Sequence, residues 1–283
     1  MKKVAPVAIV FLLAIVCIFI YINTNYYKIN HLKHLDDTSL LNLADDVYDS
    51  GDYTSIKNVY KELLENRTID LGELRIDYQC VYAACLLIDD KVGFKEEFDD
   101  LNKLYKVEDV FYYLYSGIMM VTIDNDDNLL LTYNTLLEMD DIVPDTDEEI
   151  IFYDLFMYFI GISAKDANVE HFFQDYSTHL TNLGMDLNEH FSTQRLNYTL
   201  TLLKQNSFTR FEKAFYVSCV GEDKPFDGYD FYYMLNNVEF NTVQLTHLRL
   251  SLENLKSSMA KESKKAENID MIIQRITELN PTT

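Results

Sequence analysis

Pairs of amphipathic helices recur along most of this chain at a nearly constant interval. The first pair is predicted over 40–48 and 53–64, on either side of the turn Ser50-Gly51-Asp52. Apolar residues of its second helix fall at i, i+3, i+4, i+7 and i+8 and form one stripe: Ile56, Val59, Tyr60, Leu63 and Leu64. One such pair cannot bury its apolar stripe alone, so the chain must fold by stacking its units.

Four more units follow the first. Their first helices are predicted over 74–88, 110–121, 150–162 and 191–203. The second helices of all five units start near Tyr53, Phe94, Leu130, Val169 and Phe208. This spacing of roughly forty residues is typical of a helix-pair solenoid. With only 8 glycines and 4 prolines, the chain favours helices over a many-stranded sheet. The sequence therefore predicts an all-α, helix-pair solenoid, with a non-repetitive helical bundle as the alternative.

The first unit resembles a tetratricopeptide repeat. In that family a small residue on the first helix precedes a Gly-x-Tyr turn and an aromatic residue on the second helix. Ala44, Gly51, Tyr53 and Tyr60 match those positions in register. Later units keep the architecture but lose the strict spacing. The resemblance implies a protein-binding scaffold without catalytic residues.

An uncharged apolar run, 4–22, follows the short basic tail 1–3. Its length is close to the ~20 residues that a helix needs to cross a bilayer. We expect a transmembrane signal-anchor helix, because the run is long for a cleaved leader and no A-x-A pattern follows it. The basic tail favours a cytoplasmic N-terminus, which would place the bulk of the chain on the extracytoplasmic side of the cell membrane. A secreted protein that has lost its leader is the alternative.

The rest of the chain divides into three parts. A polar linker is predicted over 23–37, tetratricopeptide-like repeats over 38–221, and C-terminal capping helices over 222–283. The capping region contains an aromatic segment and two further helices, with a basic cluster over 256–265 between those helices. Solenoid ends need such caps, because their outer face must be polar. A partner-binding or coiled-coil tail is the other interpretation of this region.

The formal net charge of −22 limits the classes of partner that the protein is expected to bind. A surface of this sign repels phosphate backbones, so no nucleic acid is expected to bind. It favours solubility, and it would also attract basic partners or divalent cations. Of the four cysteines, Cys80, Cys85 and Cys219 lie outside the apolar run and are predicted to be buried free thiols.

The sequence contains two candidate groups of metal ligands, and both depart from known motifs. Asp124, Asp126 and Asn128 alternate as calcium ligands would, but the glycine and glutamate of an EF-hand loop are missing. His171 and His179 lie eight residues apart and belong to no zinc-binding motif. We therefore predict no catalytic residue, no metal ligand and no cofactor. An enzyme on a helical scaffold remains the alternative.

Together these features predict a single-pass membrane protein that acts as an interaction scaffold or adaptor. The bilayer would hold residues 4–22, and protein partners would bind the concave face lined by the first helices of the pairs. A partner with a basic or extended segment would complement the acidic chain. The sequence does not identify the individual partner-binding residues.

Overall fold

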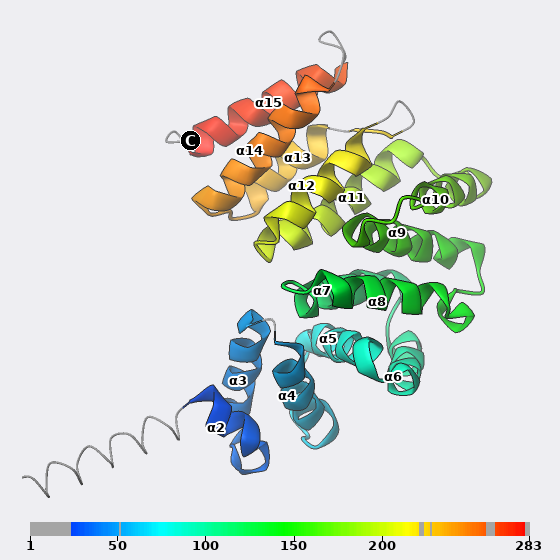
Figure 1. Ribbon diagram of the computed structural model, residues 1–283. Coiled ribbons are helices and arrows are strands. Elements are labelled where there is room, and N and C mark those ends of the chain that lie inside the picture. Colours follow the sequence, from blue (N-terminus) through cyan, green and yellow to red (C-terminus); the bar gives the residue numbers. More distant parts are fainter. Residues whose placement is uncertain (1–23, 51, 221–223, 227, 259–263, 281–283) are drawn as a thin grey trace, which may run out of the picture.

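A computed structural model describes residues 24–50, 52–220, 224–226, 228–258 and 264–280 (Figure 1). This part of the chain contains 14 α-helices, two short 3-10 helices and no strand. The all-α class is thereby confirmed. The predicted anchor over 4–22 lies outside the described residues, and none of the helices within them is both long and apolar enough to cross a membrane.

Five helix pairs lie where the periodicity predicts them. The first helices are α3 (Asp37–Ser50), α5 (Leu74–Asp89), α7 (Val107–Val121), α9 (Asp147–Ala164) and α11 (Leu187–Lys204). The second helices are α4 (Tyr53–Glu65), α6 (Lys91–Leu104), α8 (Asp126–Leu137), α10 (Glu170–Asn182) and α12 (Phe208–Cys219). The pairs pack against one another around one continuous core (Figure 1).

Two glycines allow neighbouring helices to approach closely. A Cβ atom on Gly117 of α7 would lie 3.0 Å from the backbone of Cys80 and Val81 in α5. A Cβ atom on Gly161 of α9 would lie 2.6 Å from the Val169 side chain. A larger residue at Gly117 would push α5 and α7 apart, because the atoms that it meets are backbone.

The array does not continue outward as an open superhelix, because α11 returns to contact α7. Polar side chains join the two helices at three levels. Gln194 Nε2 donates to Glu108 Oε1 at 3.1 Å, and Thr201 Oγ1 donates to Tyr112 Oη at 3.3 Å. Gln205 Nε2 donates to the Ser116 carbonyl at 3.0 Å. We call these three contacts the α7–α11 ladder.

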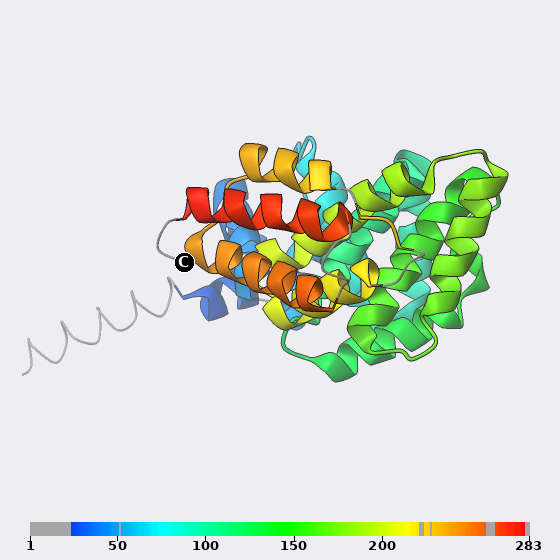
Figure 2. The ribbon, with the colours of Figure 1, turned by 90° about the horizontal axis from the view of Figure 1, so that it is seen from above.

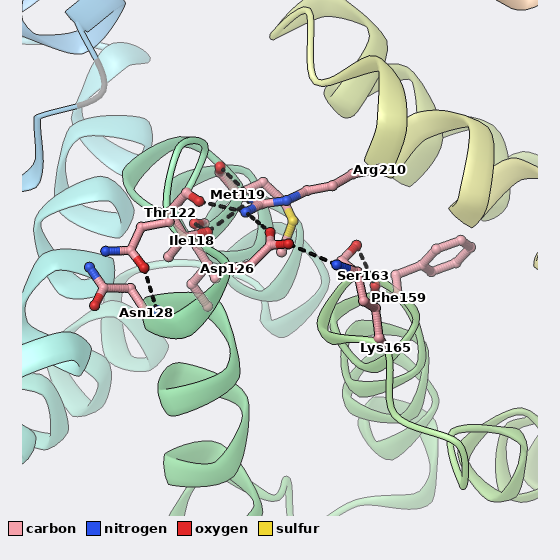
Figure 3. A network of polar contacts seen from close by, with 10 residues as sticks. Ile118, Met119, Thr122, Asp126, Asn128, Phe159, Ser163, Lys165 and Arg210 are labelled. Atoms are coloured by element: carbon pink, nitrogen blue, oxygen red, sulfur yellow. Dashed lines mark hydrogen bonds and ion pairs between the residues drawn. The ribbon is translucent and has the colours of Figure 1, made fainter.

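Arg210 of α12 extends this contact beyond the end of α7 (Figure 3). Its side chain is buried and donates to the Met119 and Thr122 carbonyls and to Thr122 Oγ1. Its Nη2 also lies 3.0 Å from Asp126 Oδ1 at the start of α8, and Lys165 Nζ lies 2.8 Å from the other oxygen of that carboxylate. One arginine thus ties α12 to the α7–α8 turn.

The segment predicted as a polar linker is largely helical. It contains α2 (Asn25–Asn30) and a 3-10 helix, η1 (Leu32–His34). The side chains of Ile29, Leu32 and Leu35 pack against the core, and Arg67 Nη2 donates to the carbonyls of Leu32 and Leu35 at 3.1 Å each. The packing of α2 and η1 on the core could not be predicted from the sequence, because only three apolar residues make the contact.

Three helices close the C-terminal end: α13 (Gly228–Asn237), α14 (Thr242–Ser257) and α15 (Lys264–Leu279). In the view from above, α15 lies between α13 and α14 (Figure 2). Leu248, Leu252 and Ile269 are buried in this layer, whereas Tyr232, Tyr233 and Met271 are exposed.

Candidate functional site

A carboxylate on α5 lies near phenol groups that come from neighbouring helix pairs. Asp77 of α5 is half-buried, and no hydrogen bond or ion pair from the described residues reaches its carboxyl group. Its charge acts on four surrounding tyrosines, namely Tyr48, Tyr60, Tyr78 and Tyr113. We call these five residues the Asp77 site.

Three stacked units contribute to this site. Tyr48 comes from the last turns of α3, Tyr60 from α4, Asp77 and Tyr78 from α5, and Tyr113 from α7. The Tyr60 and Tyr78 rings lie 4.9 Å apart between centroids. Helical periodicity places Tyr60 on the buried stripe of α4 and leaves Asp77 at the edge of the apolar face of α5.

Burial sets the electrostatics of the Asp77 site. It raises the pKa of Asp77 to about 6, with no charged or hydrogen-bonding neighbour to oppose it. Burial, with the Asp77 charge second, raises the pKa of Tyr48 to about 12. The same two causes hold the pKa of Tyr60 well above its usual range, together with the nearby Tyr78.

The hydroxyl groups of Tyr78 and Tyr60 differ in their hydrogen bonding. Tyr78 Oη donates to Asp45 Oδ1 at 3.0 Å, so a second carboxylate stands at the rim. The Tyr60 hydroxyl is buried and has no hydrogen-bond partner. A buried polar group without a partner costs about 1–3 kcal/mol, so this hydroxyl is a cost to the fold.

The site lies next to the α7–α11 ladder. The Tyr48 side chain reaches Ser116 of α7 and Gln205 at the end of α11, and both polar groups act to lower its pKa against the larger effect of burial. The Tyr48 side chain of α3 thus reaches the residue that follows α11, although Tyr48 and Gln205 are far apart in the sequence.

The alternating acidic residues considered for calcium have other roles in the structure. Asn125 caps α8 by accepting from the Asn128 backbone at 3.0 Å. The Asp126 carboxylate lies between Arg210 and Lys165, and these two cations lower its pKa (Figure 3). Within the described ranges, no group of three or more His, Cys, Asp or Glu residues is placed to hold a metal ion.

The two histidines of α10 approach one carboxylate. His179 Nδ1 lies 3.1 Å from Asp154 Oδ2 of α9, and His171 acts on the same group from farther away. Burial raises the pKa of Asp154 to about 6, and the bond from His179 opposes this shift. His171 Nδ1 lies 2.6 Å from the Asn168 carbonyl. The His179–Asp154 contact joins α10 to α9.

Cys80, Cys85 and Cys219 are all buried and free, as predicted. Burial raises the pKa of each thiol above its usual range. These thiols are therefore poor nucleophiles in the folded protein.

Sequence reasoning did not single out Asp77. The sequence around it gives no clear signal, because Arg75 and Gln79 are polar as well. The neighbours that make it unusual, Tyr48 and Tyr113, come from other units, so only the stacking brings them together.

Comparison of the chain with protein-family models, with curated proteins and with solved structures gave no significant match.

Proposed function

We propose that this protein is a membrane-anchored interaction scaffold whose inner surface binds a basic segment of a partner protein. The observation that carries the proposal is the Asp77 site: a half-buried carboxylate without a hydrogen-bond or ion-pair partner among the described residues, whose charge acts on four nearby tyrosines. Stacked helix pairs, here of a tetratricopeptide-like kind, expose broad surfaces of this type for protein partners.

A lysine or arginine side chain fits the chemistry of the site. Its cation would bond to the Asp77 carboxylate, and a charge-assisted bond of this kind is about twice as strong as a neutral one. Tyrosine faces add about 0.5–2 kcal/mol each when they contact a cation away from water. The formal charge of −22 would draw a basic segment toward the protein over longer distances.

The apolar run 4–22 supports the membrane anchor. In this proposal the anchor holds the helical array close to the bilayer, on the extracytoplasmic side. N-terminal sequencing of the mature chain tests this part. A chain that retains its first residues agrees with the anchor, and a chain that starts near Asn23 supports the secreted alternative.

Site-specific crosslinking in native membranes tests the scaffold. The full chain would carry a photo-crosslinker through the change Tyr113→benzoylphenylalanine, alone or with Asp77→Lys. Asp145→Lys is the matched control, since it makes the same change of charge at an exposed acidic residue far along the sequence. We expect a protein crosslink that Asp77→Lys abolishes and that Asp145→Lys leaves unchanged.

Affinity for the crosslinked partner should then fall at least tenfold in Asp77→Lys, measured with the purified partner. A crosslink that persists in Asp77→Lys would contradict the assignment of the site. The absence of any protein crosslink from Tyr113 would contradict the scaffold itself.

A further inference from the structure

A short basic segment lies at the N-terminal edge of the array. It comprises residues 24–35, which contain α2 and η1, and α2 packs beside α3 and α4 (Figure 1). The segment has two lysines and two histidines but no acidic residue, in a chain with 46 acidic and 24 basic residues. Only Asn23 separates it from the apolar run 4–22. We call residues 24–35 the α2–η1 segment.

The lysines of the α2–η1 segment are not neutralised by the described part of the array. Lys33 and His34 are exposed, and Lys28 is half-buried. Neither lysine forms an ion pair with a described carboxylate, whereas Lys57 and Lys95, for example, each bind an aspartate. The positive charge of the segment is therefore available to an anionic partner.

The acidic residues that follow the segment or contact it have other partners. Asp36 Oδ1 accepts from the Ser39 backbone at 2.8 Å, at the start of α3. Arg67 Nη1 lies 3.3 Å from Asp37 Oδ1, and Arg67 Nε lies 3.2 Å from Glu62 Oε1. A cation of α3's neighbouring turn, and not a lysine of the segment, thus compensates two of these three carboxylates.

The α2–η1 segment is fixed to the array. Thr24 Oγ1 accepts from the Tyr27 backbone at 3.4 Å and caps α2. The Tyr27 and His31 rings stack with their centroids 4.0 Å apart, and His31 Nδ1 lies 2.9 Å from the Tyr27 carbonyl. The apolar side chains of the segment pack on the core, and Arg67 donates to two of its carbonyls. A contact between this segment and a surface would therefore set the orientation of the helix pairs that hold it.

We infer that the α2–η1 segment lies on the bilayer surface, where Lys28 and Lys33 contact the phosphate groups of anionic lipids. The inference rests on the membrane anchor of the proposed function, because the apolar run 4–22 would bring the segment to the head groups. An anionic surface attracts lysines only within about a Debye length, ~10 Å at 0.1 M salt. The same surface repels the acidic remainder of the chain, so both effects favour one orientation, with α2 toward the bilayer.

Fluorescence quenching on the full chain in lipid nanodiscs tests the inference. The chain contains no tryptophan, so Asn30→Trp, at an exposed position of α2, introduces a single signal. Asn182→Trp, at an exposed position at the end of α10, is the matched control. The quencher is a nitroxide on the head group of a minor lipid. The nanodiscs consist of neutral phosphatidylcholine, alone or mixed with anionic phosphatidylglycerol.

Two charge variants are combined with Asn30→Trp. Lys28→Glu with Lys33→Glu reverses the charge of the lysines in the α2–η1 segment. Lys106→Glu with Lys204→Glu makes the same change at two exposed lysines, one before α7 and one at the end of α11. This second pair controls for the net charge of the chain.

In anionic nanodiscs we expect quenching of Asn30→Trp to exceed that of Asn182→Trp by about threefold or more. It should fall by about half in neutral nanodiscs and with the Lys28→Glu and Lys33→Glu pair, and the control pair should leave it unchanged. Equal quenching at the two positions, or quenching of Asn30→Trp that does not depend on anionic lipid, would overturn the inference and leave the anchor intact. A chain that does not co-purify with nanodiscs would contradict the anchor, and the inference with it.

Discussion

Asp77 and Arg210 are both ionisable side chains that are largely withdrawn from water, but their surroundings differ. Arg210 donates to two carbonyls, a hydroxyl and a carboxylate, so most of its donors are matched. Asp77 has no comparable partner among the described residues, and its pKa is raised to about 6. A residue that is costly for the fold and accessible to a ligand is typical of a functional position.

The change Asp77→Asn should stabilise the fold at neutral and basic pH. The folded state holds the Asp77 proton more tightly than the unfolded chain, whose pKa is near 3.8. The neutral carboxyl is therefore tolerated at low pH, and the fold loses stability as the pH rises from 3.8 to about 6. We expect Asp77→Asn to raise the free energy of unfolding by on the order of 2 kcal/mol at a pH of about 8.

Urea unfolding at several pH values measures this effect. The gain should shrink below a pH of about 6 and nearly vanish at a pH of about 4, where the wild-type carboxyl is neutral in the folded state. A gain of equal size at all pH values would show that Asp77 is not the titrating group.

Arg210→Met should destabilise the fold by about 3 kcal/mol, because it leaves the buried Met119 and Thr122 carbonyls without their donors. Lys165→Met is the matched control, since it removes the other cation from Asp126 at an exposed position. Its cost should stay below about 1 kcal/mol. Equal losses in the two variants, measured by thermal or urea unfolding, would argue against a special role for the buried arginine.

At the scale of the helices, the positions of the helices can be predicted from the sequence, because local periodicity determines them. The apolar stripes of α4, α6, α10 and α12 fix where these helices lie and which face each of them buries. The docking of α2 is missed because too few apolar residues carry it. The α7–α11 ladder is missed because it depends on Glu108, Tyr112 and Ser116, whose polar partners are about ninety residues away (194 minus 108 is 86). The Asp77 site could not be predicted either, because its residues come from helix pairs that are distant in the sequence.

The close approach of α5 to α7 gives a test at this scale. Gly117→Val should lower the free energy of unfolding by about 1–3 kcal/mol, because the new side chain would meet the α5 backbone. Gly93→Ala serves as the comparison, since its Cβ atom would meet only the Asp90 side chain, which can move. We expect the smaller loss there. A tolerated Gly117→Val would mean that α5 and α7 lie farther apart.

At the scale of the whole molecule, the net charge of −22 opposes compaction. Like charges repel one another in the folded state, and salt screens this repulsion over a distance of about 10 Å at 0.1 M. The same salt would weaken a long-range attraction between this acidic chain and a basic partner. Stability and partner binding should therefore respond to salt in opposite directions.

Raising sodium chloride from about 20 mM to about 300 mM should increase the free energy of unfolding by about 1 kcal/mol, or roughly 2–4 °C in Tm. Calorimetry on the full chain measures the shift, and choline chloride at equal ionic strength controls for a specific effect of sodium. A Tm that falls with added salt would indicate that ion pairs such as Arg210–Asp126 outweigh the general repulsion.

Helical arrays commonly lengthen or shorten during evolution by duplication or loss of whole units, since each unit contacts only its neighbours. The α7–α11 ladder removes that freedom here. An added or deleted helix pair between α7 and α11 would carry Gln194, Thr201 and Gln205 out of reach of Glu108, Tyr112 and Ser116. The contact between α7 and α11 therefore fixes the number of helix pairs in this part of the chain.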